Sequence, residues 1–364
     1  MFPLEIVAIV CYMLISAVTI LANFVVLTTI LLTKKLRTAS NTFLISLAVA
    51  DISVGMVTLP MRTSEVFKAS WTLRIDYCTF SHCFTLMTLT ASILNLVVIS
   101  VDRYIAIGHP YTYVKLQIYM WHFVIFSISL AWMVAILISF LPLYGWGSNG
   151  KVGRRYKGGI CKFNETVTQE YIFTVLLGIV GISILIVFFI YYKIYIIVKN
   201  HITRITPLSV PSQATDTAFS SDVYSSSRKA SLLNPTNGTL QVPAFQSRAN
   251  SITSENALGG SIIRKEKSVT KYVKHKKAFL KSWKSAKTMF FVILCFFVAW
   301  TAFIVPTSIF LKCPSCANSA VVLISTIILF SGSAVNPFIY FSKIKLFREE
   351  TKKLFAKLCW KIKV

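Results

Sequence analysis

The sequence predicts an all-α membrane protein, a seven-transmembrane helix bundle with a short amphipathic eighth helix. Of its 364 residues, 55% are hydrophobic and only 14% are charged, whereas charged residues make up about a quarter of a soluble domain. Apolar runs recur along the chain, each long enough for a helix that crosses a bilayer, which needs about 20 residues. The seven runs cover approximately residues 5–32, 42–66, 77–107, 121–144, 170–198, 286–311 and 318–342.

The net charge of +25 is distributed as in a membrane protein. Basic residues gather in residues 34–37, 264–284 and 343–363, which fall on one side of seven successive spans. The positive-inside rule makes that side cytoplasmic and places the N-terminus outside. The basic loop at residues 151–162 falls on the opposite side and is an exception. Three basic segments against one decide the orientation. We therefore expect a multi-pass plasma-membrane protein that contacts anionic lipids and binds no nucleic acid.

The chain divides into four segments on this pattern. Between the fifth and sixth runs the composition turns rich in Ser, Thr, Asn and Gln and poor in aromatic residues, which is typical of disorder. The segments are 1–198 with spans one to five, 199–281 as a long and largely disordered cytoplasmic loop, 282–342 with spans six and seven, and 343–364 as an amphipathic helix and basic cytoplasmic tail.

The tail carries an apolar stripe at helical spacing, formed by Phe347, Leu354, Phe355 and Leu358. Lysines separate these residues, so the segment is expected to lie on the inner leaflet as an interfacial helix. Cys359 follows the stripe and is a candidate palmitoylation site, with an unmodified thiol as the alternative.

The third run is the expected axis of the bundle. As a helix, Cys78 to Arg103 would cover roughly 37 Å at a rise of about 1.5 Å per residue, enough to cross a bilayer with some tilt. Thr85 and Ser92 follow Cys78 at steps of seven residues, and Arg103 comes eleven residues later. These four side chains therefore fall close to one face of the helix.

Polar residues within apolar runs are costly and therefore mark sites. This chain has an ordered set of them, with the triplet Asp102-Arg103-Tyr104 at the end of the third run. The others are Asn23, Asp51, Ser92, Asn95, Trp132, Trp300 after Phe296, and the segment Asn336-Pro337-Phe338-Ile339-Tyr340. Over the whole membrane portion, this set resembles the rhodopsin-like family of G-protein-coupled receptors.

The resemblance implies a disulfide and a sodium pocket. Cys78 and Cys161 would tie the third span to the second outer loop, and Cys313 with Cys316 gives a further disulfide candidate. Asp51, Ser92, Ser333 and Asn336 would surround an allosteric sodium ion, the one cofactor we expect. Carboxylate, hydroxyl and amide oxygens suit a hard cation, and a protonated structural acid is the alternative for Asp51.

The resemblance also implies a signalling mechanism. Asp102 would hold Arg103 at rest, and Arg103 would be released to face Tyr192, Tyr340 and an inserted helix of a heterotrimeric G protein. Trp300 would rotate between the ligand and the cytoplasmic opening. Tyr104, Asn336 and Pro337 belong to the same motifs. Arrestin and receptor kinases are implied as further partners.

The ligand is less clear from the sequence. Thr85 stands where monoamine receptors have an Asp, and Phe330 stands where opsins have the retinal lysine. Local segments at 50–55, 142–146 and 161–163 are similar to adenosine receptors. However, the positions whose side chains bind adenine and ribose in adenosine receptors are occupied by Thr307, Leu329 and Phe330 in this sequence. A purine-like ligand is slightly favoured, and a lipid, an amine-like molecule or a short peptide are alternatives.

The expected ligand site is largely apolar, with Arg62 as its charged member. Glu65 could pair with Arg62 one helical turn away, and Arg62 is either a snorkelling interfacial residue or an anchor for an anionic ligand. The site comprises Met61, Arg62, Thr85, Leu86, Leu89, Phe163, Leu176, Trp300, Phe303, Ile304, Thr307, Thr326 and Phe330. Asn164-Glu165-Thr166 is a glycosylation sequon on the expected outer side.

Two other classes of protein are weaker alternatives. A transporter or channel would be expected to show internal repeats and paired charges within the membrane, whereas Asp51 is the clear acid at mid-span. An intramembrane enzyme would need metal-spaced histidines or a nucleophile with a base. The spans contain no such set, so we expect no enzymatic activity.

Overall fold

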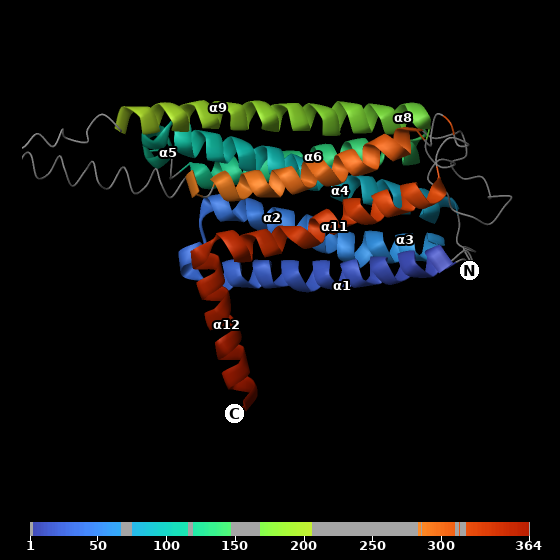
Figure 1. Cartoon of the computed structure of the whole chain (residues 1–364), viewed down its shortest axis with the longest axis horizontal. Coiled ribbons are helices and arrows are strands. Elements are labelled where there is room, and N and C mark those ends of the chain that lie inside the picture. The colour runs from blue at the N-terminus through green and yellow to red at the C-terminus, as the bar shows by residue number, and fades with distance from the viewer. Residues whose placement is uncertain are drawn as a thin grey trace, which may run out of the picture. The chain divides into compact units, whose positions relative to one another are not determined.

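The computed structural model describes residues 3–66, 75–115, 119–146, 168–205, 283–284, 286–309, 313 and 318–363. Within this part, seven helices are long and apolar enough to cross a membrane, which confirms the predicted fold class (Figure 1). They span Pro3–Leu32, Ala39–Val66, Cys78–Gly108, Met120–Ser139, Glu170–Asn200, Ala286–Ile309 and Ala320–Lys343.

The individual elements follow these spans. They are α1 (Pro3–Leu32), η1 (Lys34–Leu36), α2 (Ala39–Ser53), η2 (Val54–Thr58), α3 (Leu59–Val66), α4 (Ile75–Gly108), α5 (Pro110–Lys115), α6 (Met120–Ser139), η4 (Leu141–Tyr144), α8 (Gln169–Phe173), η5 (Thr174–Gly181), α9 (Ile182–Ile205), α11 (Ser319–Lys343) and α12 (Lys345–Lys363). The helix Ala286–Ile309 lies between α9 and α11 in the chain.

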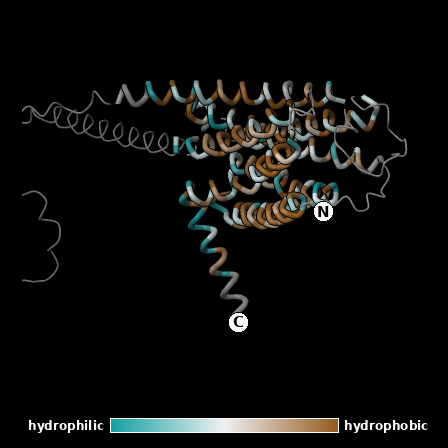
Figure 2. The backbone as a smooth tube through the Cα atoms, turned by 45° about the vertical axis from the view of Figure 1, so that its right-hand side comes forward, coloured by the Kyte–Doolittle hydropathy of each residue, from teal (hydrophilic) through white to brown (hydrophobic). Residues whose placement is uncertain are grey.

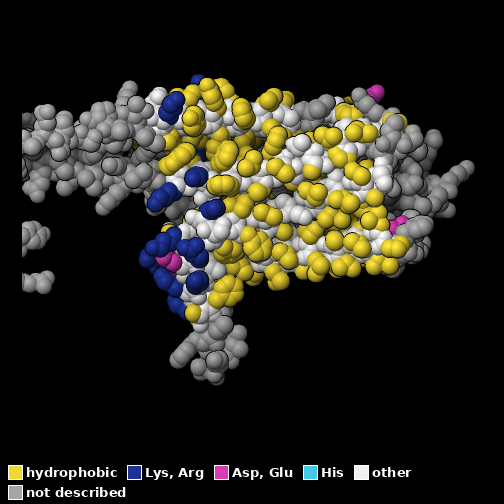
Figure 3. Space-filling model, in the orientation of Figure 1, with side chains coloured by type: hydrophobic (Ala, Val, Ile, Leu, Met, Phe, Trp, Pro, Cys, Tyr) yellow, Lys and Arg dark blue, Asp and Glu magenta, His cyan; other side chains and the backbone are white. Residues whose placement is uncertain are grey.

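The long helix α4 is in contact with much of the bundle, as expected of an axis. It contacts α2, α6 and η5, while α1 packs against α2, α3 and α11. Hydrophobic side chains cover most of the visible face of the spans, and Lys and Arg gather at the end where α12 begins (Figure 3). The spans are hydrophobic along their length, whereas the first part of α12 is mostly hydrophilic (Figure 2).

Two of the spans contain a π-helical segment, η2 in the second and η5 in the fifth. A π-turn closes its hydrogen bonds one residue later than an α-turn, so it changes which side chains face inward beyond it. In η2 the carbonyl of Gly55 accepts a hydrogen bond from the Ser16 hydroxyl of α1 (2.6 Å). A Cβ at Gly55 would lie only 2.8 Å from Ile20 Cγ1, so glycine permits this close approach of α1.

The last helix confirms the predicted eighth helix. α12 begins directly after α11 and packs against α1 and α11. Phe347 is buried, and its ring centroid lies 5.2 Å from that of Phe341 and 6.5 Å from that of Tyr340. Phe355 is 48% exposed, so the predicted stripe is divided between the bundle and the outside. Contact with the inner leaflet stays a prediction, as do the four segment boundaries and the disorder of residues 207–260.

Candidate functional site

A buried carboxylate marks the centre of the bundle, where α2, α4 and α11 meet. Asn336 donates a hydrogen bond from Nδ2 to Asp51 Oδ2 (2.9 Å), and Ser92 and Ser333 lie beside the same carboxylate. Asn23 of α1 donates to the Ser333 carbonyl (3.1 Å) and so ties α1 to this centre. The structure therefore brings together the four residues predicted to bind sodium.

The chemistry of this centre fits a hard cation. Asp51 Oδ1 and Ser92 Oγ are buried, and neither has a hydrogen-bond partner among the described residues. Buried oxygens without partners are costly, and a cation with oxygen ligands would satisfy them. The described residues contain no group of three or more His, Cys, Asp or Glu side chains that could hold a metal ion.

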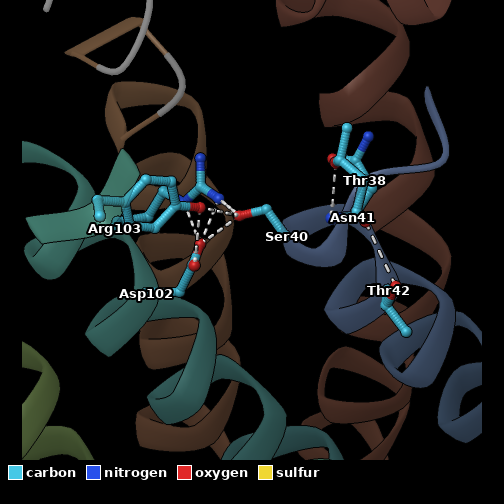
Figure 4. A network of polar contacts seen from close by, with 7 residues as sticks. Thr38, Ser40, Asn41, Thr42, Asp102 and Arg103 are labelled. Atoms are coloured by element: carbon cyan, nitrogen blue, oxygen red, sulfur yellow. Dashed lines mark hydrogen bonds and ion pairs between the residues drawn. The ribbon is translucent and has the colours of Figure 1, made fainter. Parts of the chain in front are cut away.

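A second polar cluster lies at the basic end of the bundle, around Arg103. Thr38 caps α2 by accepting a hydrogen bond from the backbone of Asn41, and this places Ser40 in the first turn. From there, Ser40 points toward Asp102 and Arg103 of α4 (Figure 4). Ser40 and Arg103 donate hydrogen bonds to Asp102 Oδ2, and for Arg103 Nε the distance is 3.0 Å. The ion pair predicted to hold Arg103 is present.

The short helix α5 supplies a further donor to this cluster. The Tyr113 hydroxyl donates to Asp102 Oδ1 (3.3 Å). Burial raises the pKa of this tyrosine, and the negative charge of Asp102 raises it further. The hydroxyl is therefore protonated at neutral pH and available as a donor. Tyr104, the third residue of the triplet, instead packs edge-to-face on His109 at 6.2 Å between ring centroids.

The tyrosine of the fifth span that faces Arg103 is Tyr191, which corrects the prediction of Tyr192. Tyr192 is 55% exposed, on the surface of the helix bundle. Tyr191 packs against the sixth span, 5.6 Å from Phe290 between ring centroids, and has Ser100 and Arg103 as its polar neighbours. Adjacent residues of a helix point about 100° apart, so a register error of one residue exchanges inward and outward positions.

The seventh-span motif lies between these two polar clusters. Pro337 falls inside α11, next to Asn336 at the Asp51 carboxylate. Tyr340 is buried, and its ring packs edge-to-face against Phe347 of α12. Arg103 is paired with Asp102 in this arrangement. That this pairing represents the resting state of a receptor stays a prediction.

Six of the thirteen predicted ligand residues meet in one hydrophobic cluster, which we call the outer cluster. Its buried members include Tyr12, Leu89, Trp300, Leu329 and Phe330, and Leu86, Phe303 and Ile304 pack against them. Trp300 lies 5.7 Å from Phe296 and 6.3 Å from Phe303 between ring centroids, tilted against Phe296 and edge-to-face with Phe303.

The threonine hydroxyls of the predicted ligand site differ in whether they make a hydrogen bond within the protein. The Thr85 hydroxyl donates to the Ser81 carbonyl (2.9 Å), and the Thr326 hydroxyl donates to the Val322 carbonyl (2.8 Å). The buried Thr307 hydroxyl has no hydrogen-bond partner within the described ranges. Thr307 is therefore the threonine with unmet hydrogen-bonding capacity.

Several predicted site residues fall where the structure gives no description. Cys78 and Cys313 are each disulfide-bonded, but their predicted partners are among the undescribed residues, so both pairings stay predictions. The undescribed site residues are Cys161, Phe163, Asn164 and Cys316. Leu176 and Cys359 are helical, but their side chains are also outside the described part.

Comparison with known proteins agrees with this geometry. The family model of the 7-transmembrane receptor (rhodopsin family) matches residues 22–340. This chain belongs to the rhodopsin family of seven-transmembrane receptors. It is therefore a multi-pass membrane protein.

The relatives of this receptor chain include proteins named for amines. It is 32% identical to the histamine H2 receptor of Rattus norvegicus, over 53% of this chain and 53% of that receptor. It is 27% identical to the 5-hydroxytryptamine receptor 1B of Equus caballus, over 98% of this chain and 88% of that receptor. The histamine-receptor alignment thus covers about half the length of each chain. The resemblance to adenosine receptors stays a prediction.

Sequence reasoning missed some residues of this receptor's polar clusters. Ser40, Tyr113 and Tyr191 belong to the cluster around Arg103, and their positions depend on how separate helices pack. The position of His82, whose Nε2 lies 3.2 Å from Glu65 Oε1, was also not predicted. The signal that could have found His82 is its spacing of four residues from Cys78, which places it on the inward face of α4.

Proposed function

We propose that this chain is a plasma-membrane receptor with its N-terminus outside. It binds a small extracellular ligand in the outer cluster and activates a heterotrimeric G protein at the basic end. The observation that carries the proposal is the ion pair of Arg103 with buried Asp102, next to Tyr191. A buried ion pair that can break and present its arginine to a partner is a two-state element, which a signalling receptor requires.

The outer cluster supports a small ligand with a large apolar surface. Its aromatic and aliphatic side chains include Trp300, which packs on Phe296 toward the middle of the helix. A ligand that packs differently against Trp300 in the two states would shift the equilibrium toward the signalling state.

The proposed class of ligand depends on the relatives and on the polar groups near the outer cluster. The named relatives are amine receptors, but Thr85 offers no carboxylate to an ammonium. A purine-like ligand remains the interpretation of the local segments, and the Thr307 hydroxyl and the Trp300 N–H, unpartnered among the described residues, are polar groups that could read it. A lipid or a short peptide is the alternative.

Further parts of the proposal concern ions, modifications and partners. Sodium would bind at Asp51 as an allosteric ion, Asn164 would carry a glycan and Cys359 a palmitoyl group. Arrestin and receptor kinases would bind the same cytoplasmic side as the G protein. The basic residues that gather at this end support that orientation.

Signalling in cells tests the proposal. The chain and its Arg103→Ala variant would be expressed with cyclic-AMP and calcium readouts and exposed to nucleosides, amines, lipids and short peptides. We expect a response in the parent chain, basal or ligand-induced, that Arg103→Ala abolishes at equal surface expression. An unchanged response in the variant, or an ion flux without any G-protein response, would contradict it.

A further inference from the structure

A largely buried Arg62–Glu65 ion pair with His82 beside it, which we call the triad, lies at the outer ends of α3 and α4. Arg62 Nη1 lies 2.7 Å from Glu65 Oε2, and His82 Nε2 lies 3.2 Å from Glu65 Oε1. The side chains of these three residues are 16%, 11% and 0% exposed. Each carboxylate oxygen of Glu65 therefore has a side-chain nitrogen close to it, and the two nitrogens come from two different helices. The contact from Arg62 is a hydrogen bond.

Such a triad is an expensive feature within membrane-spanning segments. A buried ion pair contributes little to stability, because the loss of hydration offsets the attraction between the charges. Ionisable side chains inside spans are for this reason expected to serve a ligand or ion pathway. Here the triad lies apart from both the Asp51 centre and the Arg103 cluster.

The triad borders the outer cluster. Tyr12 belongs to that cluster, lies 6.4 Å from Phe330 between ring centroids, and has Arg62 and Glu65 among its charged neighbours. Val66, the residue after Glu65, also packs against the outer cluster. A ligand whose apolar body occupied this cluster would have its polar end close to the triad.

The charges of the triad favour an anionic group on the ligand. An ammonium would have to displace both donors from Glu65. A carboxylate would instead meet a guanidinium, which can bind carboxylates through paired N–H groups. Thr85 does not offer a competing charge, since its hydroxyl is neutral and donates within its own helix.

We propose that Arg62 binds the carboxylate of a small aromatic or aliphatic acid, whose body lies in the outer cluster. Glu65 holds the guanidinium in position, and His82 holds Glu65. The proposal rests on the proposed function, since it specifies the ligand class for that receptor. The proposed ligand is negatively charged, whereas the amines for which the relatives are named are positively charged at neutral pH.

Matched pairs of small molecules test the sign of the charge directly. The purified receptor would be incubated with histamine or imidazole-4-acetate, 5-hydroxytryptamine or 5-hydroxyindole-3-acetate, and dopamine or 3,4-dihydroxyphenylacetate. Each pair has one ring system and differs in the charged group. The midpoint of thermal unfolding reports binding without any G protein. We expect at least one acid to raise the midpoint more than its amine partner.

Variants then locate the contact. Arg62→Gln should weaken acid binding by about tenfold to a hundredfold, as the loss of a charged hydrogen-bonding partner implies. Arg62→Lys should retain part of the affinity, because it keeps the charge but not the paired donors. Glu65→Gln should weaken acid binding less than Arg62→Gln, because the guanidinium stays but loses the carboxylate that positions it. Each variant is compared with its own ligand-free midpoint, which separates binding from stability.

Three outcomes would overturn the proposal: no shift with any acid, equal or larger shifts with the amines, or acid binding that survives Arg62→Gln. These outcomes are distinguishable from failure of the proposed function. Arg103-dependent signalling in cells can persist when no acid binds, and acids can bind a chain that activates no G protein.

Discussion

At the scale of single residues, Asp102 organises the polar cluster at the basic end. Its carboxylate is fully buried and accepts hydrogen bonds from Ser40, Arg103 and Tyr113, which come from three different helices. A buried carboxylate without enough donors is costly. The closed cluster is therefore stabilised by each donor, and each donor must be replaced or lost when Arg103 is released.

Tyr113→Phe should raise basal activation of the G protein. The change removes a donor to a buried charge, worth about 1.5–3 kcal/mol when well aligned. Since this bond is long, at 3.3 Å, we expect the lower end, about tenfold in basal activity. Basal nucleotide exchange in membranes measures it. Tyr119→Phe is the control, because Tyr119 is 66% exposed. Unchanged basal exchange in Tyr113→Phe would show that α5 does not restrain the cluster.

The two tyrosines of the fifth span provide an internal comparison. Tyr191→Phe should lower maximal G-protein activation about fivefold, because it removes a hydroxyl beside Arg103. A hydrogen bond formed by that hydroxyl after Arg103 is released would be worth about 1 kcal/mol. Tyr192→Phe should have no effect, since its side chain is exposed on the outer surface. The same nucleotide-exchange assay measures both. If Tyr192→Phe were the defective variant, the inward face of α9 would be misassigned.

Residues recognisable by motif were predictable, and residues brought together by packing were not. Asp51, Arg103 and Asn336 stand out because polar groups are rare in apolar runs, and the structure places them in polar clusters. Tyr191 differs, because the fifth run is apolar on every side and its period does not show which face is buried. Ser40 and Tyr113 lie in polar connecting regions, where nothing in the sequence points to Asp102.

At the scale of elements, the two π-helical segments explain why register was harder to predict than helix number. Length and apolar composition predict a span, but not an inserted π-turn within it. η5 precedes Tyr191 in the fifth span, so the side chains beyond it face directions that an uninterrupted α-helix would not give. η2 precedes Arg62 and Glu65 in the same way and sets the direction in which they point.

Gly55→Ala should destabilise the receptor, because the new Cβ would lie 2.8 Å from Ile20 Cγ1 and 3.2 Å from the Ser16 carbonyl oxygen. Overpacking of this kind costs about 1–3 kcal/mol. The midpoint of thermal unfolding in detergent measures it. Gly178→Ala in η5 is a matched control, as a Cβ there meets nothing within 4 Å. Equal midpoints for the two variants would mean that α1 adjusts to η2 at little cost.

At the scale of the whole molecule, the Asp51 centre joins helices that are far apart in the sequence. Asn336 binds Asp51 across 285 positions, and Asn23 binds the Ser333 carbonyl across 310 positions. Because these contacts join α1, α2 and α11, an ion bound there would stabilise one arrangement of the bundle. A ligand that favours another arrangement of the helices would then lower the affinity for that ion, and the ion would lower the affinity for the ligand by the same factor.

Asp51→Asn should abolish stabilisation by sodium. For the parent chain, raising sodium chloride at constant ionic strength, with choline chloride as the substitute, should raise the thermal midpoint. An ion at about a hundred times its dissociation constant adds about 2.7 kcal/mol. The variant removes the charge but keeps the size of the side chain, so its midpoint should not respond to sodium. Ser46→Ala is the control, because Ser46 binds Trp132 of α6 and lies outside the centre. If the sodium response persisted in Asp51→Asn, sodium would not bind at Asp51. Asp51 would then be a protonated, structural acid.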